Sequence, residues 1–361
     1  MRLLTATLLI PLLLVPARAT PGDPPFEEIT PETKQSIDKG LSWLLKNQNR
    51  DGSWGISERD RGDYTCTSIA CMALMAGGNN QRNGPDPTAV GAVRRGLDWM
   101  LTEARKNPGG IAKGDTTLVQ NKLGKEVHNF FSVVFLSQAY GMEELEVTSD
   151  EKTQIKEVLT DLCAYISKTQ ESDGSWSKES FGGLKGTCMA WMALRSAHSA
   201  GVSVEDASVK KIVDFVTKRY DKRTHMFDNS GGDWGGYQTL YASSSCLRVL
   251  YGMGPDAHNV DLHESYKAIY QFVSKGGLQG QFLTVEGEDY LAAWMITQAM
   301  LHDGNDDWEE WFTFIRGKLM KHQNNDGSWT GTACISGKTF STCCALLALQ
   351  TPYRQLPMQD L

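Results

Sequence analysis

The 361-residue sequence lacks several features that would point to common kinds of partner. It has no excess of positive charge, because its formal net charge is −7, and a nucleic-acid-binding protein needs a basic face. It has no long block of like charges and no low-complexity stretch. After residue 19, no apolar segment is long enough to span a bilayer. We therefore expect neither a nucleic-acid partner nor a transmembrane span.

The first residues are typical of a secretory signal peptide. Arg2 precedes an apolar run over residues 3–15, and a small-x-small cleavage pattern ends at Ala19. We expect cleavage after Ala19 and export, to a periplasm or the medium; an uncleaved membrane anchor is the alternative. The expected division of the chain is a signal peptide over 1–19, a flexible leader over 20–31, one domain over 32–350 and a C-terminal tail over 351–361.

Three segments, at 39–54, 162–176 and 317–329, repeat one another. Each combines an amphipathic helix that ends in Gln with a turn that ends in Gly-Ser-Trp. Glycine stops the helix because it adopts positive φ without strain, and the Trp can fold back as a large apolar plug. The Gln can bond backbone groups that are left free at a helix end.

A second helix follows each turn and is apolar nearly all round, which predicts burial on every side. With weaker copies between the strong ones, we expect six helix pairs in two layers, the apolar helices inside and the amphipathic ones outside. A solenoid is the alternative, but solenoids need polar end repeats, whereas the first and last repeats here are among the best copies. The equivalent positions on the six inner helices are Cys71, Ser132, Cys188, Cys246, Ala292 and Cys343.

Segment 39–54 resembles the QW motif of squalene–hopene and oxidosqualene cyclases, and the copies ending at Trp176 and Trp329 are similar. The resemblance covers roughly residues 32–350. It implies an all-α fold, the α/α toroid of the terpenoid cyclase and protein prenyltransferase superfamily. It also implies a protein that acts on or binds an isoprenoid or other apolar ligand in a central cavity.

The superfamily's chemical signatures are only partly present. Class II cyclases protonate an alkene or epoxide with an Asp-x-Asp-Asp motif; residues 60–63 and 303–307 are the nearest segments here. Asp63, Cys66 and His128 are similar to the Asp, Cys and His zinc ligands of prenyltransferases, in which the metal holds a thiolate nucleophile. Asp63 and Cys66 are, however, one residue further apart than in the family's Asp-x-Cys.

Acidic residues ahead of the fifth inner helix are further candidates. Glu286, Glu288 and Asp289 either favour the N-terminus of that helix or act as general acids together with His128 and Asp63. In the simpler interpretation, His128 is a structural hydrogen-bonding residue and Asp63 is a helix cap. Three functions stay open: a cyclase- or prenyltransferase-like enzyme, a non-catalytic toroid that binds a ligand or a protein, and a carbohydrate-active helical barrel that uses rim carboxylates.

Cys66 and Cys334 lie outside the repeat-equivalent positions, ahead of the first and last inner helices. These helices meet only if the ring closes, so we predict a Cys66–Cys334 disulfide, which would remove Cys66 from any zinc site. Intact mass with and without reductant, followed by peptide mapping, should find one disulfide at these positions. Two free thiols there would contradict the prediction.

Overall fold

The fold is taken from a computed structural model of the chain. It describes residues 26–57, 60–107, 110–111, 117–142, 150–176, 183–228, 236–253, 260–274, 282–283, 287–303, 307–333 and 335–358. Within these residues, no helix is both long and apolar enough to cross a membrane.

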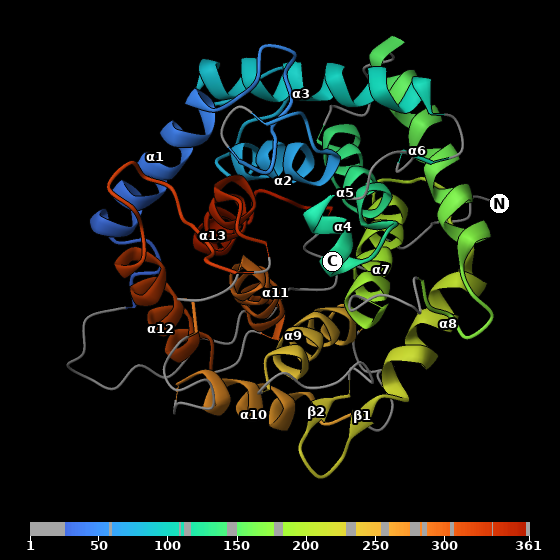
Figure 1. Cartoon of the computed structure of the whole chain (residues 1–361), viewed down its shortest axis with the longest axis vertical. Coiled ribbons are helices and arrows are strands. Elements are labelled where there is room, and N and C mark those ends of the chain that lie inside the picture. The colour runs from blue at the N-terminus through green and yellow to red at the C-terminus, as the bar shows by residue number, and fades with distance from the viewer. Residues whose placement is uncertain are drawn as a thin grey trace, which may run out of the picture.

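Long helices alternate along the chain between an outer and an inner ring (Figure 1). The outer helices are α1 (Pro31–Lys46), α3 (Pro87–Lys106), α6 (Asp150–Thr169), α8 (Asp206–Thr217), α10 (Leu262–Ser274) and α12 (Asp307–Lys321). The inner helices are α2 (Tyr64–Met75), α5 (Val127–Gly141), α7 (Gly183–Ser199), α9 (Tyr237–Tyr251), α11 (Gly287–Asp303) and α13 (Lys338–Gln350). The predicted all-α toroid of six helix pairs is confirmed.

The ring is closed. Each inner helix packs against the next, and α13 packs against α2. In the outer ring, α12 contacts α1, so the two ends of the chain's helical body lie side by side (Figure 1). The solenoid alternative is therefore wrong.

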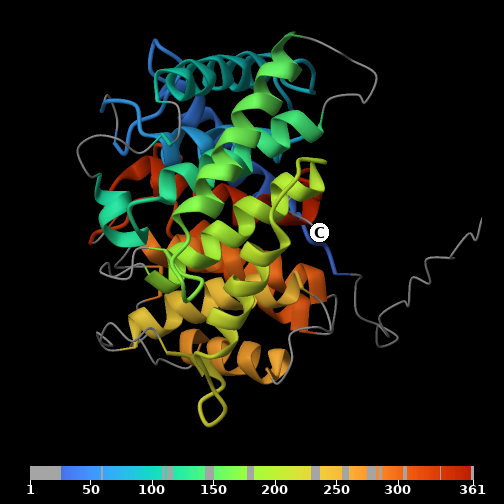
Figure 2. The same cartoon turned by 90° about the vertical axis from the view of Figure 1, so that its right-hand side faces the viewer.

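Smaller elements in the connections were not anticipated from the sequence. Helix α4 (Leu118–Leu123) precedes α5, and strands β1 (Tyr220–Asp221) and β2 (Met226–Phe227) form an antiparallel hairpin between α8 and α9 (Figure 2). A 3₁₀ turn, η2 (Thr351–Tyr353), follows α13. None of them interrupts the inner ring.

The inner helices are buried because they offer no polar face, as predicted. In α2 every residue except Tyr64 is buried, and in α13 every residue except Lys338. Small side chains at the repeat-equivalent positions let the helices approach closely: the Sγ atoms of Cys188 on α7 and Cys246 on α9 are 3.8 Å apart. Both thiols are fully buried.

The repeated tryptophans join each outer helix to its inner partner. The indole Nε1 of Trp54 donates to the carbonyl of Leu44 at 2.9 Å, and Trp329 donates to Leu319 at 2.8 Å. Their backbone N–H groups donate to Thr67 of α2 and Thr342 of α13. Trp176 makes the equivalent contacts with Ile166 and Thr187. All three rings are buried plugs, as predicted.

The glutamine of each strong repeat reaches the next outer helix. Gln48 Nε2 donates to the carbonyls of Gly52 and Ala92, the latter in the middle of α3 and not at a helix end. Gln170 Nε2 likewise donates to the carbonyl of Ser208, which lies in the first turn of α8. Gln323, in the last repeat, donates to Ser36 of α1 at 2.8 Å, so the same bond closes the ring.

The turn glycines allow this close approach. Gly52, Gly174 and Gly327 have φ of 95°, 95° and 93°. A Cβ on Gly327 would lie 2.5 Å from the carbonyl oxygen of Lys39 on α1, and Gly52 and Gly174 are as tightly placed against α3 and α8. Any other residue would be strained in φ and would push the next outer helix away.

The amino-terminal ends of the inner helices share one end of the ring, and the C-terminal tail crosses the other. Met358 N lies 3.4 Å from Gln138 Oε1 on α5, while η2 packs on α11 and α13. Leu356 is buried beneath this crossing. The end at which the inner helices begin is therefore where a site can form.

Replacing Gln323 with Ala should destabilise the chain as much as replacing Gln48, by about 1–3 kcal/mol. Each change removes the side-chain hydrogen bonds to two equivalent backbone carbonyls. Chemical denaturation followed by circular dichroism measures this. Gln355→Ala, at an exposed position with only a local bond to Tyr353, is the control and should cost little. An unchanged unfolding free energy in Gln323→Ala alone would mean that this bond does not hold the ring closed.

Candidate functional site at the start of the inner helices

The described candidates all lie at one end of the ring. Asp63 is the N-cap of α2, His128 is the second residue of α5, and Glu288 and Asp289 are the second and third residues of α11. All four are at most 3% exposed. Glu286 lies outside the described residues.

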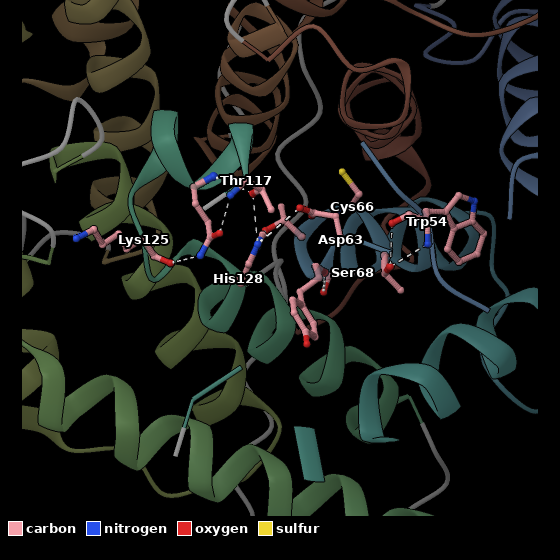
Figure 3. Close-up of polar contacts among 11 residues, drawn as sticks. Trp54, Asp63, Cys66, Ser68, Thr117, Lys125 and His128 are labelled. Atoms are coloured by element: carbon pink, nitrogen blue, oxygen red, sulfur yellow. Dashed lines mark hydrogen bonds and ion pairs between the residues drawn. The ribbon is translucent and has the colours of Figure 1, made fainter. Parts of the chain in front are cut away.

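Asp63 and His128 face each other across the α2–α5 contact (Figure 3). Asp63 Oδ1 caps α2 by accepting from the backbone N–H of Cys66 at 2.8 Å, as the simpler interpretation proposed. Asp63 Oδ2 lies 3.6 Å from His128 Nε2, which is longer than a direct hydrogen bond, and it has no hydrogen-bond donor among the described residues. One carboxylate oxygen is thus structural and the other is available.

Two threonines orient the imidazole of His128. Thr65 Oγ1 lies 2.8 Å from Nδ1, and Thr117 Oγ1 lies 3.4 Å from Nε2. Burial lowers the pKa of His128, and the nearby Asp63 carboxylate only partly opposes this. If Thr65 donates to Nδ1, the neutral ring carries its proton on Nε2, which faces Asp63.

Cys66 does not join this pair. Its thiol is fully buried, and Figure 3 shows its sulfur directed away from His128. Burial, followed by the charge of Asp63, raises the pKa of the thiol well above its usual range. Among the described residues, no group of three His, Cys, Asp or Glu side chains is placed to hold a metal ion. The arrangement therefore does not fit the three-ligand zinc site that the resemblance implied.

The predicted Cys66–Cys334 disulfide is not decided by this geometry, because Cys334 lies outside the described residues. Electrostatic interaction with the Cys343 and Cys344 thiols of α13 also raises the pKa of the Cys66 thiol. Cys66 therefore lies near α13, the side of α2 on which the ring closes.

Glu288 forms a buried ion pair that the sequence analysis missed. Lys185 Nζ on α7 contacts Glu288 Oε1 and donates to Gln238 Oε1 on α9 at 3.1 Å. Lys185 and Glu288 are each 1% exposed. Helices α7 and α11 are separated in the inner ring by α9, so the ion pair joins two helices that are not neighbours. The available signal was a lysine near the start of a largely apolar inner helix.

Asp289 has a mainly structural environment. Its Oδ1 accepts from the hydroxyl of Tyr241 at 2.8 Å, and its Oδ2 accepts from the backbone N–H of Leu283 at 3.0 Å. Both oxygens are therefore bonded, which makes Asp289 a poorer general acid than Asp63. We call Asp63, His128, Lys185, Gln238, Glu288 and Asp289 together the polar layer.

An aromatic layer lies deeper in the ring. Phe131 on α5 and Trp294 on α11 stack with centroids 6.3 Å apart, although their helices are not neighbours in the ring. Trp294 lies six residues beyond Glu288 on α11, and Trp191 lies six residues beyond Lys185 on α7. Each ring is therefore about 9 Å further along its helix axis. All three rings are at most 2% exposed. The inner ring therefore carries polar side chains where its helices begin and aromatic rings further along the helices.

Comparison with known proteins assigns the fold. No family profile matches the sequence. The chain is 22% identical over 227 residues, 59% of its length, to a probable squalene–hopene cyclase of Sinorhizobium fredii. It is 35% identical over 81 residues, 22% of its length, to an ent-copalyl diphosphate synthase of a Streptomyces species. These matches span 33% and 14% of those two proteins.

Solved structures agree on the architecture. A type II terpene cyclase from Scytonema, bound to geranylgeranyl dihydroxybenzoate, superposes with a TM-score of 0.56 at 14% identity over 91% of this chain and 98% of that chain. An α-1,6-mannanase of Salegentibacter, bound to α-1,6-mannotetrose, gives 0.60 at 10% identity over 90% and 99%. The chain is a terpenoid cyclase-like α/α toroid, a fold that glycosidases also use.

The pH dependence of the free energy of unfolding should show whether His128 is neutral in the folded chain. Since its pKa is lower in the folded chain than the value of about 6.5 in an unfolded one, stability is full above about pH 6.5 and falls as the pH drops towards the folded pKa. His128→Gln should reduce this fall between pH 7.5 and 5.5, by at most about 1.4 kcal/mol per pH unit. Urea unfolding at each pH measures it, with the exposed His198→Gln as control. An unchanged pH dependence in His128→Gln would contradict a neutral His128.

Proposed function

We propose that this chain is a cyclase-like toroid that binds, and acts on, an isoprenoid or similarly apolar molecule at the start of its inner helices. The observation that carries the proposal is Asp63 Oδ2, a buried carboxylate oxygen without a described donor, in the layer above an aromatic centre. Aromatic faces suit apolar chains and attract the positive charge that develops when an alkene is protonated.

Asp63 is the acid in this proposal. Its capping oxygen is fixed by Cys66 N–H, so the carboxyl is held in one orientation. A protonated Oδ2 can deliver its proton to a double bond, and the buried His128 beside it can then stabilise the carboxylate that remains. Asp63→Asn keeps a competent N-cap, so loss of turnover by about 100-fold or more in a folded variant would identify the acid.

The carbohydrate-active alternative has one observation in its favour, the three carboxylates in the polar layer. Glycoside hydrolysis needs two carboxyl groups that are free to exchange protons or attack. Asp289 is bonded at both oxygens, and Glu288 is paired with Lys185, which leaves Asp63 as the freest acid. An acid that is not paired with a lysine favours alkene protonation over a two-carboxylate mechanism.

We also propose that the chain is exported. Residues inside the expected leader are already bound to the fold: Arg316 of α12 donates to the carbonyls of Glu27 and Glu28, and Trp308 Nε1 donates to Glu28 Oε1 at 2.9 Å. A mature chain beginning at Thr20 would therefore keep every one of these contacts. N-terminal sequencing of protein recovered outside the cytoplasm tests this.

Binding of farnesol should quench the tryptophan fluorescence of the purified chain, while α-1,6-mannotetrose should leave it unchanged. Phe131→Leu should weaken farnesol binding about three- to tenfold, because it removes an aromatic face that stacks on Trp294. Phe314→Leu, in outer helix α12, is the matched control and should bind as the parent does. Mannotetrose binding without farnesol binding would replace this proposal by the carbohydrate alternative.

A further inference from the structure

The polar layer also restricts which head group the proposed apolar ligand can carry. This argument rests on the proposed function, since it asks which apolar molecule fits the site. Its starting point is Glu288 Oε2, which is buried and has no hydrogen-bond donor among the described residues. Leaving a buried carboxylate oxygen unpaired is costly, so such an atom needs a donor other than the described residues, and a ligand can supply one.

The only cation of the polar layer is already committed. Lys185 contacts Glu288 and Gln238 and lies 5.7 Å from the ring centroid of Tyr241. An ammonium has three donors, and these three neighbours surround it. Lys185 therefore has little capacity left for an anion on the ligand.

The surrounding charge is negative. Burial keeps His128 neutral, so the layer holds three carboxyl groups against one ammonium. Arg61 and Lys125, the cations that flank Asp63 and His128 in the sequence, are exposed. A diphosphate would bring further negative charge to buried carboxylates and would find no free cation among the described residues, at a cost of several kcal/mol.

A hydroxyl meets each requirement. It can donate a hydrogen bond to Glu288 Oε2. It adds no charge. We propose that the ligand of this toroid is an apolar chain with a neutral hydroxyl head, and that the Glu288–Lys185 bridge selects it against prenyl diphosphates.

Three probes with one chain length test the proposal: farnesene, which has no head group, farnesol, and farnesyl diphosphate. Titration calorimetry on the parent chain should rank farnesol first and farnesyl diphosphate last, with at least about a tenfold difference in Kd between these two. Diphosphate binding that equals or exceeds that of farnesol would overturn the inference and leave apolar binding intact. Binding of none of the three would overturn the proposed function and the inference with it.

Glu288→Gln gives the second readout. It removes the carboxylate that faces the head group and frees the charge of Lys185, so binding of farnesyl diphosphate should tighten about tenfold or more, and the preference for farnesol should fall. Glu264→Gln is the matched control, because Glu264 also pairs with a lysine near the start of a helix, Lys267, but its side chain is 42% exposed on outer helix α10. It should leave the ranking unchanged.

If Glu288→Gln does not fold, the ranking of the three probes by the parent chain still decides the proposal. An unchanged ranking in a folded Glu288→Gln variant would show that Glu288 does not select the head group, and would overturn the assigned role.

Discussion

The ring depends on one repeated contact, in which a buried tryptophan fixes each strong turn and the preceding glutamine bonds a backbone carbonyl of the next outer helix. Trp329 and Gln323 repeat, at the seam, what Trp54 and Gln48 do at the first step. The turn glycine, with its positive φ, makes the approach possible. Because the last repeat uses α1 as its next helix, the chain closes without a special joining element.

Closure creates the site. It places six inner helices side by side with their amino-terminal ends together, so that side chains from α2, α5, α7, α9 and α11 enter one polar layer. The opposite end is crossed by residues 351–358, and the centre is filled by Phe131, Trp191 and Trp294. A polar layer above aromatic rings matches the proposed ligand, which has a small polar head on an apolar body.

The fold could be predicted because its determinants are local and repeated: the Gln, the turn glycine, the Trp, and the apolar helix that follows. Asp63 and His128 could be placed at one rim because the repeat register puts both at the start of an inner helix. Lys185 was missed because its partner Glu288 is 103 residues away and on a helix that is not its neighbour in the ring. Contacts between inner helices that are not neighbours in the ring leave no periodic pattern in the sequence.

The zinc site was suggested by residue types whose directions the sequence does not encode. Cys66 follows Asp63 by three residues, a spacing that places both on one face of a helix. The structure nevertheless directs the Cys66 sulfur away from His128 (Figure 3). The small elements α4 and β1–β2 were missed because each consists of only a few residues in a long connection.

The most direct test of this account is hydrogen exchange at the indole N–H groups of Trp54, Trp176 and Trp329, followed by nuclear magnetic resonance. A closed ring predicts that the indole N–H of Trp329, at the seam, exchanges as slowly as those of Trp54 and Trp176, because all three are buried and bonded alike. Faster exchange of Trp329 alone, at a rate set by local opening of the last repeat, would contradict closure and, with it, the shared polar layer.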